Sequence, residues 1–115
     1  MSIKRIEVGP RMSQAVVHGE TVYVAGQVAH NPVPSVEKQT RQILAQIDKV
    51  LKQAGSSKAK LLKANIWLSD IRTFDEMNKV WDSWVSQGNT PARATVEARL
   101  AGPQYLVEIM VTAAL

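Results

Sequence analysis

The chain has 115 residues, 45% of them hydrophobic and 21% charged, which is ordinary for a folded globular protein and excludes a disordered chain. It contains no cysteine, which excludes thiol catalysis, disulfides and cysteine-based zinc sites, and its length predicts one domain over residues 1–115. The net charge of +4 comes from basic residues spread along the whole chain, so we interpret them as a solvated surface and do not expect a nucleic-acid partner.

The chain begins with MSIKRIEVGP, which carries basic residues but no apolar run of signal-peptide length. No stretch of the sequence approaches the ~18 apolar residues of a membrane span, so we expect a cytoplasmic protein without a membrane partner. The β-prone runs 15–18 and 21–26 predict two strands around a turn at Gly19. Residues 3–8 are a candidate for one more strand.

Residues 35–55 predict an amphipathic helix that begins after an N-cap at Ser35 and ends at Gly55. Its apolar side chains recur at helical spacing and predict a core-facing stripe of Val36, Ile43, Leu44, Ile47, Val50 and Leu51. The β-prone run 64–69 follows and predicts a further strand.

A second amphipathic helix is predicted over residues 73–88. Thr73 and Glu76 fit a capping box at its start, and Gly88 is placed to end it. Two of the three tryptophans lie on its apolar stripe, which predicts core packing rather than base stacking for Phe74, Met77, Val80, Trp81, Trp84 and Val85.

Residues 90–115 contain two β-prone runs, which we predict to form a hairpin with its turn at residues 101–104. In the first run a period of two places four polar side chains on one side: Arg93, Thr95, Glu97 and Arg99. In the hairpin register Glu108 lies roughly opposite Glu97, within reach of that side. The order of elements predicts an α+β fold, with two helices on one face of a single mixed sheet of five or six strands.

The last strand is apolar on both of its sides. Tyr105, Val107, Ile109 and Val111 alternate with Leu106, Met110 and Ala114. One side meets the helices, and nothing else in the chain is left to cover the other. We therefore predict a homo-oligomer in which copies of the chain cover this face.

The motifs of the usual nucleophilic, metal-dependent and nucleotide-binding enzymes are missing. There is no Gly-x-Ser-x-Gly elbow, no HExxH and no glycine-rich phosphate loop, so we expect neither a metal nor another cofactor. By residue type alone, His18, His30 and Asn78 are interpreted as polar surface residues.

Arg93 and Glu108 are charges among residues of apolar character, so each needs a partner or a ligand. Arg93 fits either an ion pair, with Glu97, Glu108 or another subunit, or a planar fork that binds a substrate carboxylate through two hydrogen bonds. Glu108 fits a salt bridge, an exposed edge position, or a carboxylate whose pKa is raised by burial. In the last case it could exchange a proton with water near neutral pH.

Three segments resemble the Rid family, the reactive intermediate deaminases also called the YjgF or RidA group: VYVAGQVAHNP, FDEMNKVWDSWV and TPARATVEARLAGPQYLVEIMVTAA. The resemblance implies a chorismate-mutase-like fold and a homotrimer with substrate clefts between neighbouring subunits. It also implies an activity like that of 2-iminobutanoate/2-iminopropanoate deaminase. In that reaction 2-imino acids, or their enamine tautomers, are hydrolysed to 2-keto acids and ammonia without a cofactor.

The same resemblance implies that Arg93 anchors the substrate carboxylate and that Glu108 positions and activates water. The cleft would be lined by Ala25, Gly26, Asn78 and Thr95. Three departures indicate a divergent subgroup: Ala25 stands where archetypal members have serine, Thr95 where they have cysteine, and PRMSQ offers no match for a tyrosine near their start.

Two other functions remain open at this stage. The chain could be a module that binds small 2-keto acids without turnover. The three departures from the family pattern leave fewer side-chain contacts to the substrate than an enzyme of the family would have. Some family members are described as RNA-cleaving or translation-inhibiting proteins, and the family also carries the name L-PSP endoribonuclease. The sequence lacks a basic stripe interleaved with aromatic residues, which argues against that third function.

Overall fold

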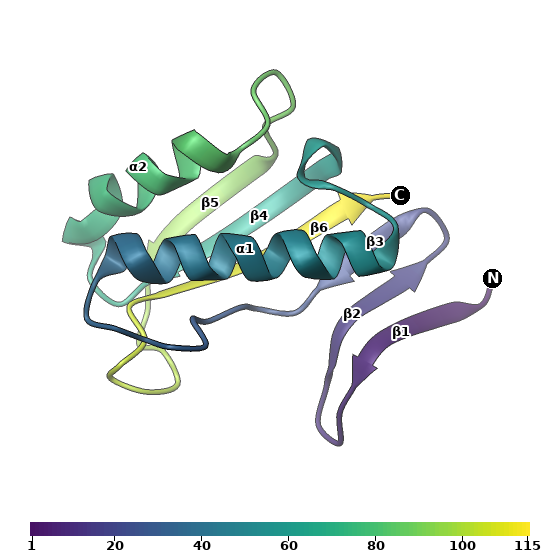
Figure 1. Cartoon of the computed structure of the whole chain (residues 1–115), viewed down its shortest axis with the longest axis horizontal. Coiled ribbons are helices and arrows are strands. Elements are labelled where there is room, and N and C mark those ends of the chain that lie inside the picture. The colour runs from purple at the N-terminus through teal and green to yellow at the C-terminus, as the bar shows by residue number, and fades with distance from the viewer.

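The computed structural model describes residues 1–115 as a six-stranded mixed sheet with two helices packed on one face (Figure 1). The helices are α1 (Val36–Ala54) and α2 (Phe74–Trp84). The strands are β1 (Ile3–Val8), β2 (Ser13–His18), β3 (Thr21–Val24), β4 (Leu61–Leu68), β5 (Ala92–Glu97) and β6 (Val107–Ala114). The predicted fold class is confirmed, and the candidate strand at residues 3–8 is real.

The strand order in the sheet is β1-β2-β3-β6-β4-β5. All neighbouring pairs are antiparallel except β4 and β5, which α2 connects as a helical crossover and which run parallel. A helical crossover carries the chain back to the end of the sheet at which β4 began, so β5 starts there and runs parallel to β4. β6 then pairs with β4 on its other side and lies in the middle of the sheet.

The predicted hairpin between the two C-terminal strands is therefore wrong. β4 lies between β5 and β6, and residues 98–106 form a loop that passes the end of β4 instead of a tight turn. This loop is tied to β4 by two backbone hydrogen bonds, from Ala98 N to Leu68 O at 2.9 Å and from Ser69 N to Leu106 O at 3.1 Å. Glu108 consequently lies beside Trp67 of β4 and not beside Glu97.

Helix α1 agrees with its prediction at both ends. The Ser35 side chain accepts a hydrogen bond from Lys38 N, and Gly55 adopts the left-handed conformation with φ of 87° that ends the helix. All six predicted stripe residues are buried. Each large apolar side chain buried in this way stabilises the fold by about 1.5–3 kcal/mol relative to an exposed one.

Helix α2 differs from its prediction at both ends. A 3-10 turn over Ile71–Thr73 precedes it, and Thr73 Oγ1 donates to Asp70 O, so the predicted capping box does not form. The helix ends at Trp84, four residues before Gly88, because Val85 is already extended. Met77, Val80, Trp81 and Val85 are buried as predicted, whereas Phe74 is exposed. Neither α1 nor α2 combines the length and apolar character needed to span a membrane.

The second face of the sheet has no helix over it (Figure 1). Its exposed apolar side chains include Tyr23, Val96 and Met110, which are 51%, 49% and 38% exposed. The alternating partners in β6, such as Ile109 and Val111, are fully buried beneath the helices. The prediction that the last strand is apolar on both sides holds only in part. Met110 and Ala114 lie on its uncovered side, but Glu108 and Thr112 alternate with them, and Tyr105 and Leu106 precede the strand. We call the uncovered side of the sheet the open face.

Candidate active site

Arg93 lies on β5 on the helix-covered side of the sheet. In the register it stands beside Ala64 of β4, which in turn stands beside Val111 of β6, and both neighbours are buried. Its Nη1 atom donates a hydrogen bond of 2.8 Å to Asn78 Oδ1 on α2. β5 is the edge strand of the sheet, and Arg93 is one of five residues that line a small pocket of about 220 Å³ there.

No acid within the chain neutralises Arg93. The three ion pairs of the chain are Arg41–Glu37, Arg72–Asp70 and Lys79–Glu37. An ion pair with Glu97 or Glu108 in the same chain was one interpretation of the sequence, and it is wrong. Burial lowers the pKa of the Arg93 guanidinium, an effect that the charge of Asp82 partly opposes. The charge is partly removed from water without a counter-ion, which makes Arg93 a candidate binding site for an anion.

Glu108 lies on the open face of β6. It stands beside Trp67 of β4, and Val96 of β5 is the next residue in that row. Its carboxylate makes no ion pair, and burial raises its pKa. Arg93 and Glu108 therefore project from opposite faces of the same sheet. The expectation that they share one side within a chain is wrong, because it relied on the hairpin register.

The Glu108 carboxylate packs directly against the backbone of Gly26. A Cβ atom on Gly26 would overlap Glu108 Oε2 and lie 3.2 Å from Glu108 Cδ. The residues that follow Gly26 and Glu108 hold the two segments together. Gln27 N donates to Ile109 O at 2.8 Å, and Ile109 N donates to Gln27 O at 3.1 Å. The Glu108 carboxylate thus occupies the space that a side chain at position 26 would fill.

Two buried glutamine side chains hold the loops around Glu108. Gln39 of α1 donates to Val33 O and Gln104 O and accepts from Leu106 N, at 2.9 to 3.0 Å, and so ties the segment before β6 to the segment before α1. Gln27 donates to Gln14 Oε1 and accepts from Gln46 of α1. Both ends of the Gly26–Glu108 contact are therefore anchored to α1.

We expect Gly26→Ala to displace the Glu108 carboxylate and leave the fold intact, since the overlapping atom belongs to a flexible side chain. A shift of about 1 Å in a catalytic group can reduce the rate about 100-fold. A matched control is Gly102→Ala, whose new methyl would overlap only the side chain of Gln104. Steady-state rates and melting temperatures of the two variants test this, and equal activities would contradict a role for the Gly26–Glu108 contact.

The remaining sequence-predicted residues are divided between the two faces. Thr95 stands beside Ile66 on the helix-covered side, two residues from Arg93, and its buried Oγ1 atom has no hydrogen-bond partner. Ala25 precedes Gly26 on the open-face side of the site, with its N–H bonded to Gln14 O. His18 and His30 are exposed, as expected. No three histidine, aspartate or glutamate side chains gather in a way that could hold a metal ion.

Phe74 and Trp81 contact Arg93, and the sequence analysis assigned both only to core packing. The guanidinium carbon of Arg93 lies 5.3 Å from the ring centre of Trp81 and 5.8 Å from that of Phe74. One signal was available: Asn78 interrupts an otherwise apolar helical stripe between these two rings. A polar residue on a core-facing stripe indicates a buried polar partner.

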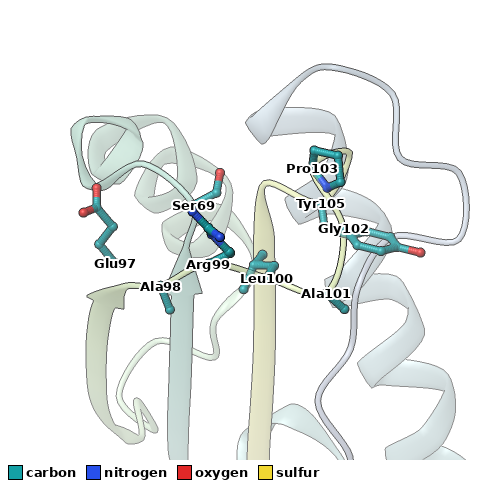
Figure 2. A pocket seen from close by; sticks show the side chains of 9 residues that line it. All are labelled: Ser69, Glu97, Ala98, Arg99, Leu100, Ala101, Gly102, Pro103 and Tyr105. Atoms are coloured by element: carbon teal, nitrogen blue, oxygen red, sulfur yellow. The ribbon is translucent and has the colours of Figure 1, made fainter.

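A larger hollow, of about 770 Å³, lies where residues 98–105 pass the end of the sheet (Figure 2). Its wall consists largely of short side chains and loop backbone, together with Arg99 and Tyr105. Glu97 points away from Arg99 in Figure 2, and its Oε1 atom accepts from Ile71 N at 3.0 Å. Neither Arg93 nor Glu108 lines this hollow.

Comparisons with known proteins show which family the sequence and the fold resemble. The family model described as Endoribonuclease L-PSP matches residues 2–115. The RutC family protein YoaB of Escherichia coli is 46% identical over 114 residues, covering 99% of both chains. A solved member of the YjgF protein family from Neisseria meningitidis is 46% identical with a TM-score of 0.97, covering 99% of this chain and 95% of that one. YyfA from Yersinia pestis, described as a Rid family protein of unknown function, is 35% identical with a TM-score of 0.91 and covers 99% and 100%.

Proposed function

The chain belongs to the YjgF or Rid family, whose model carries the description Endoribonuclease L-PSP, and from this premise we propose that it hydrolyses reactive 2-imino acids to 2-keto acids and ammonia. One observation carries the proposal. Arg93 is a partly buried cation without a counter-ion, and Glu108 is a partly buried carboxylate without an ion pair. A small carboxylate ligand and a water molecule are the partners that these two groups lack.

The site is complete only between two copies of the chain, because Arg93 and Glu108 project from opposite faces of one sheet. β5 is an edge strand, so its Arg93 can reach the open face of a neighbouring copy, where Glu108 and Gly26 lie. The exposed Tyr23, Val96 and Met110 give that open face an apolar surface to bury. We propose a closed homotrimer with the open faces turned inward and one substrate cleft at each seam.

In the proposed reaction Arg93 binds the substrate carboxylate and fixes the imine carbon in the cleft. Water adds to that carbon while the Glu108 carboxylate takes a proton from it, and Glu108 then gives the proton to the nitrogen. In the resulting carbinolamine the hydroxyl proton passes to the nitrogen by way of Glu108. The C–N bond then breaks, its electron pair leaves with the nitrogen as ammonia, and the oxygen becomes the carbonyl of the 2-keto acid. One water is consumed for each ammonia released, and no cofactor takes part.

The test is the rate of ammonia release from imines made in place by an amino-acid oxidase. Addition of the purified chain should raise this rate above that of free hydrolysis, and Arg93→Ala should give only the free rate. The measurement should include imines with short apolar side chains, because Trp67 stands beside Glu108 in the sheet and Val96 stands beside Trp67. If the wild type leaves every imine at its free rate, the hydrolase proposal is wrong.

A second function, reversible binding of 2-keto acids without turnover, is supported by the residues around the site. Ala25 supplies no hydroxyl beside Gly26, and Thr95 Oγ1 is buried rather than directed to solvent. The pocket would then recognise a carboxylate through Arg93, and no hydroxyl from position 25 or 95 would help Glu108 to orient an attacking water. Binding with no imine hydrolysis would establish this function in place of the first.

A further inference from the structure

Three side chains from one stripe of α2 hold Arg93: Phe74, Asn78 and Trp81. They follow one another at spacings of four and three residues, so the helix presents a ring, an amide and a second ring to the guanidinium. We call these three residues the α2 clamp. Nη1 of Arg93 is bonded to Asn78, and no hydrogen bond within the chain uses Nε or Nη2.

The α2 clamp contains no charged side chain. An amide acceptor and two aromatic faces attract a cation and so orient it, but none of them carries a charge that would cancel its own. Asp82, further along α2, is the acid whose charge acts on Arg93, and it forms no ion pair with it. An aspartate at position 78 would satisfy the guanidinium fully, and the chain instead has the amide of the same shape.

Building on the proposed function, we propose that the α2 clamp is a neutral holder that orients Arg93 and reserves its positive charge for the ligand carboxylate. Phe74, Asn78 and Trp81 are then positioning residues that act through Arg93 without touching the reacting atoms. The rings restrict the plane of the guanidinium, and Asn78 occupies Nη1. The edge formed by Nε and Nη2 remains available for two parallel hydrogen bonds to a carboxylate.

Asn78→Asp is the decisive variant, because it keeps the shape of the clamp and adds the missing counter-ion. Binding of 2-oxobutanoate, measured by titration calorimetry, should weaken about 10- to 100-fold, the size of one charge-assisted interaction. For imine hydrolysis KM should rise by a similar factor while kcat changes less than about three-fold. The melting temperature should rise, because a partly buried charge gains its partner.

Two further variants separate positioning from general structure. Asn89→Asp adds the same charge in the exposed loop after α2 and should leave 2-oxobutanoate affinity unchanged. Trp81→Phe keeps an aromatic face and should retain most of the affinity, whereas Trp81→Leu keeps an apolar side chain but no ring and should lose several-fold more. If Trp81 had only a structural role, both variants would differ from the wild type in melting temperature but not in their affinity for 2-oxobutanoate.

The outcomes distinguish the clamp from the enzymatic proposal. If the wild type binds 2-oxobutanoate, Asn78→Asp weakens that binding and no imine is hydrolysed, the clamp stands and the hydrolase proposal is wrong. If Asn78→Asp binds with wild-type affinity, the clamp proposal is overturned even where turnover is intact. Failure of the wild type to bind 2-oxobutanoate at all also overturns it, because the reserved charge would then serve no carboxylate.

Discussion

Glu108→Gln should abolish most of the imine hydrolysis and leave the affinity for 2-keto acids nearly unchanged. General-base catalysis by a positioned carboxylate contributes about 100- to 10,000-fold, and glutamine cannot accept the proton from water. Glutamine has the same shape, so its contact with Gly26 can persist. The measurements are kcat from ammonia release and the dissociation constant of 2-oxobutanoate. Equal turnover in the variant and the wild type would exclude Glu108 as the base.

The pH dependence of the wild type should have a definite sign. Burial raises the pKa of Glu108, and only the ionised form accepts a proton, so kcat/KM should fall as pH decreases through this raised pKa. The fold binds the Glu108 proton more tightly than the unfolded chain does, so Glu108 destabilises the fold as pH rises past its unfolded pKa. Glu108→Gln should therefore remove the acid limb of the rate profile and raise the melting temperature at neutral pH.

The elements that the sequence predicted correctly are those with strong local signals. Helix α1 has a six-residue apolar stripe with a serine N-cap at one end and a left-handed glycine at the other, and all of these agree with the structure. At the start of α2 the local signal was misleading, because Thr73 bonds back to Asp70 in a 3-10 turn. A capping box and such a turn use the same residue types, so spacing alone does not separate them.

The pairing of strands β5 and β6 could not be read from their own residues. A β-prone run followed by a loop and a second run is typical of a hairpin, but α2 had already made β5 parallel to β4. β4 thus pairs with β5 along one edge and with β6 along the other. This pairing depends on how the whole chain packs and not on the residues of β5 and β6 alone. The resemblance to the Rid family pointed to Arg93 and Glu108 as residues, yet their placement on opposite faces followed only from this strand order.

That placement yields the sharpest test of the proposed site. Arg93→Ala and Glu108→Gln should each be inactive alone, and oligomers assembled from an equal mixture of the two should regain activity. In the proposed ring each cleft takes Arg93 from one subunit and Glu108 from the next. A Glu108→Gln subunit still supplies the arginine, and an Arg93→Ala subunit still supplies the glutamate. A cleft formed by these two subunits in that order contains an intact pair. Random assembly produces this at about one cleft in four, so the mixture should reach about a quarter of the wild-type rate.

The control is Arg93→Ala mixed with the double variant that carries both substitutions, in which no cleft can contain the pair. Both mixtures should be unfolded, refolded together and compared at equal oligomer concentration, so that only the distribution of side chains differs. If the first mixture stays as inactive as the control, Arg93 and Glu108 must serve the same cleft from one chain. Such a cleft within one chain is unfavourable, because Arg93 stands beside Ala64 and Glu108 beside Trp67, and these two residues of β4 point to opposite faces of the sheet. Recovery would therefore demonstrate that each cleft takes Arg93 from one copy of the chain and Glu108 from another.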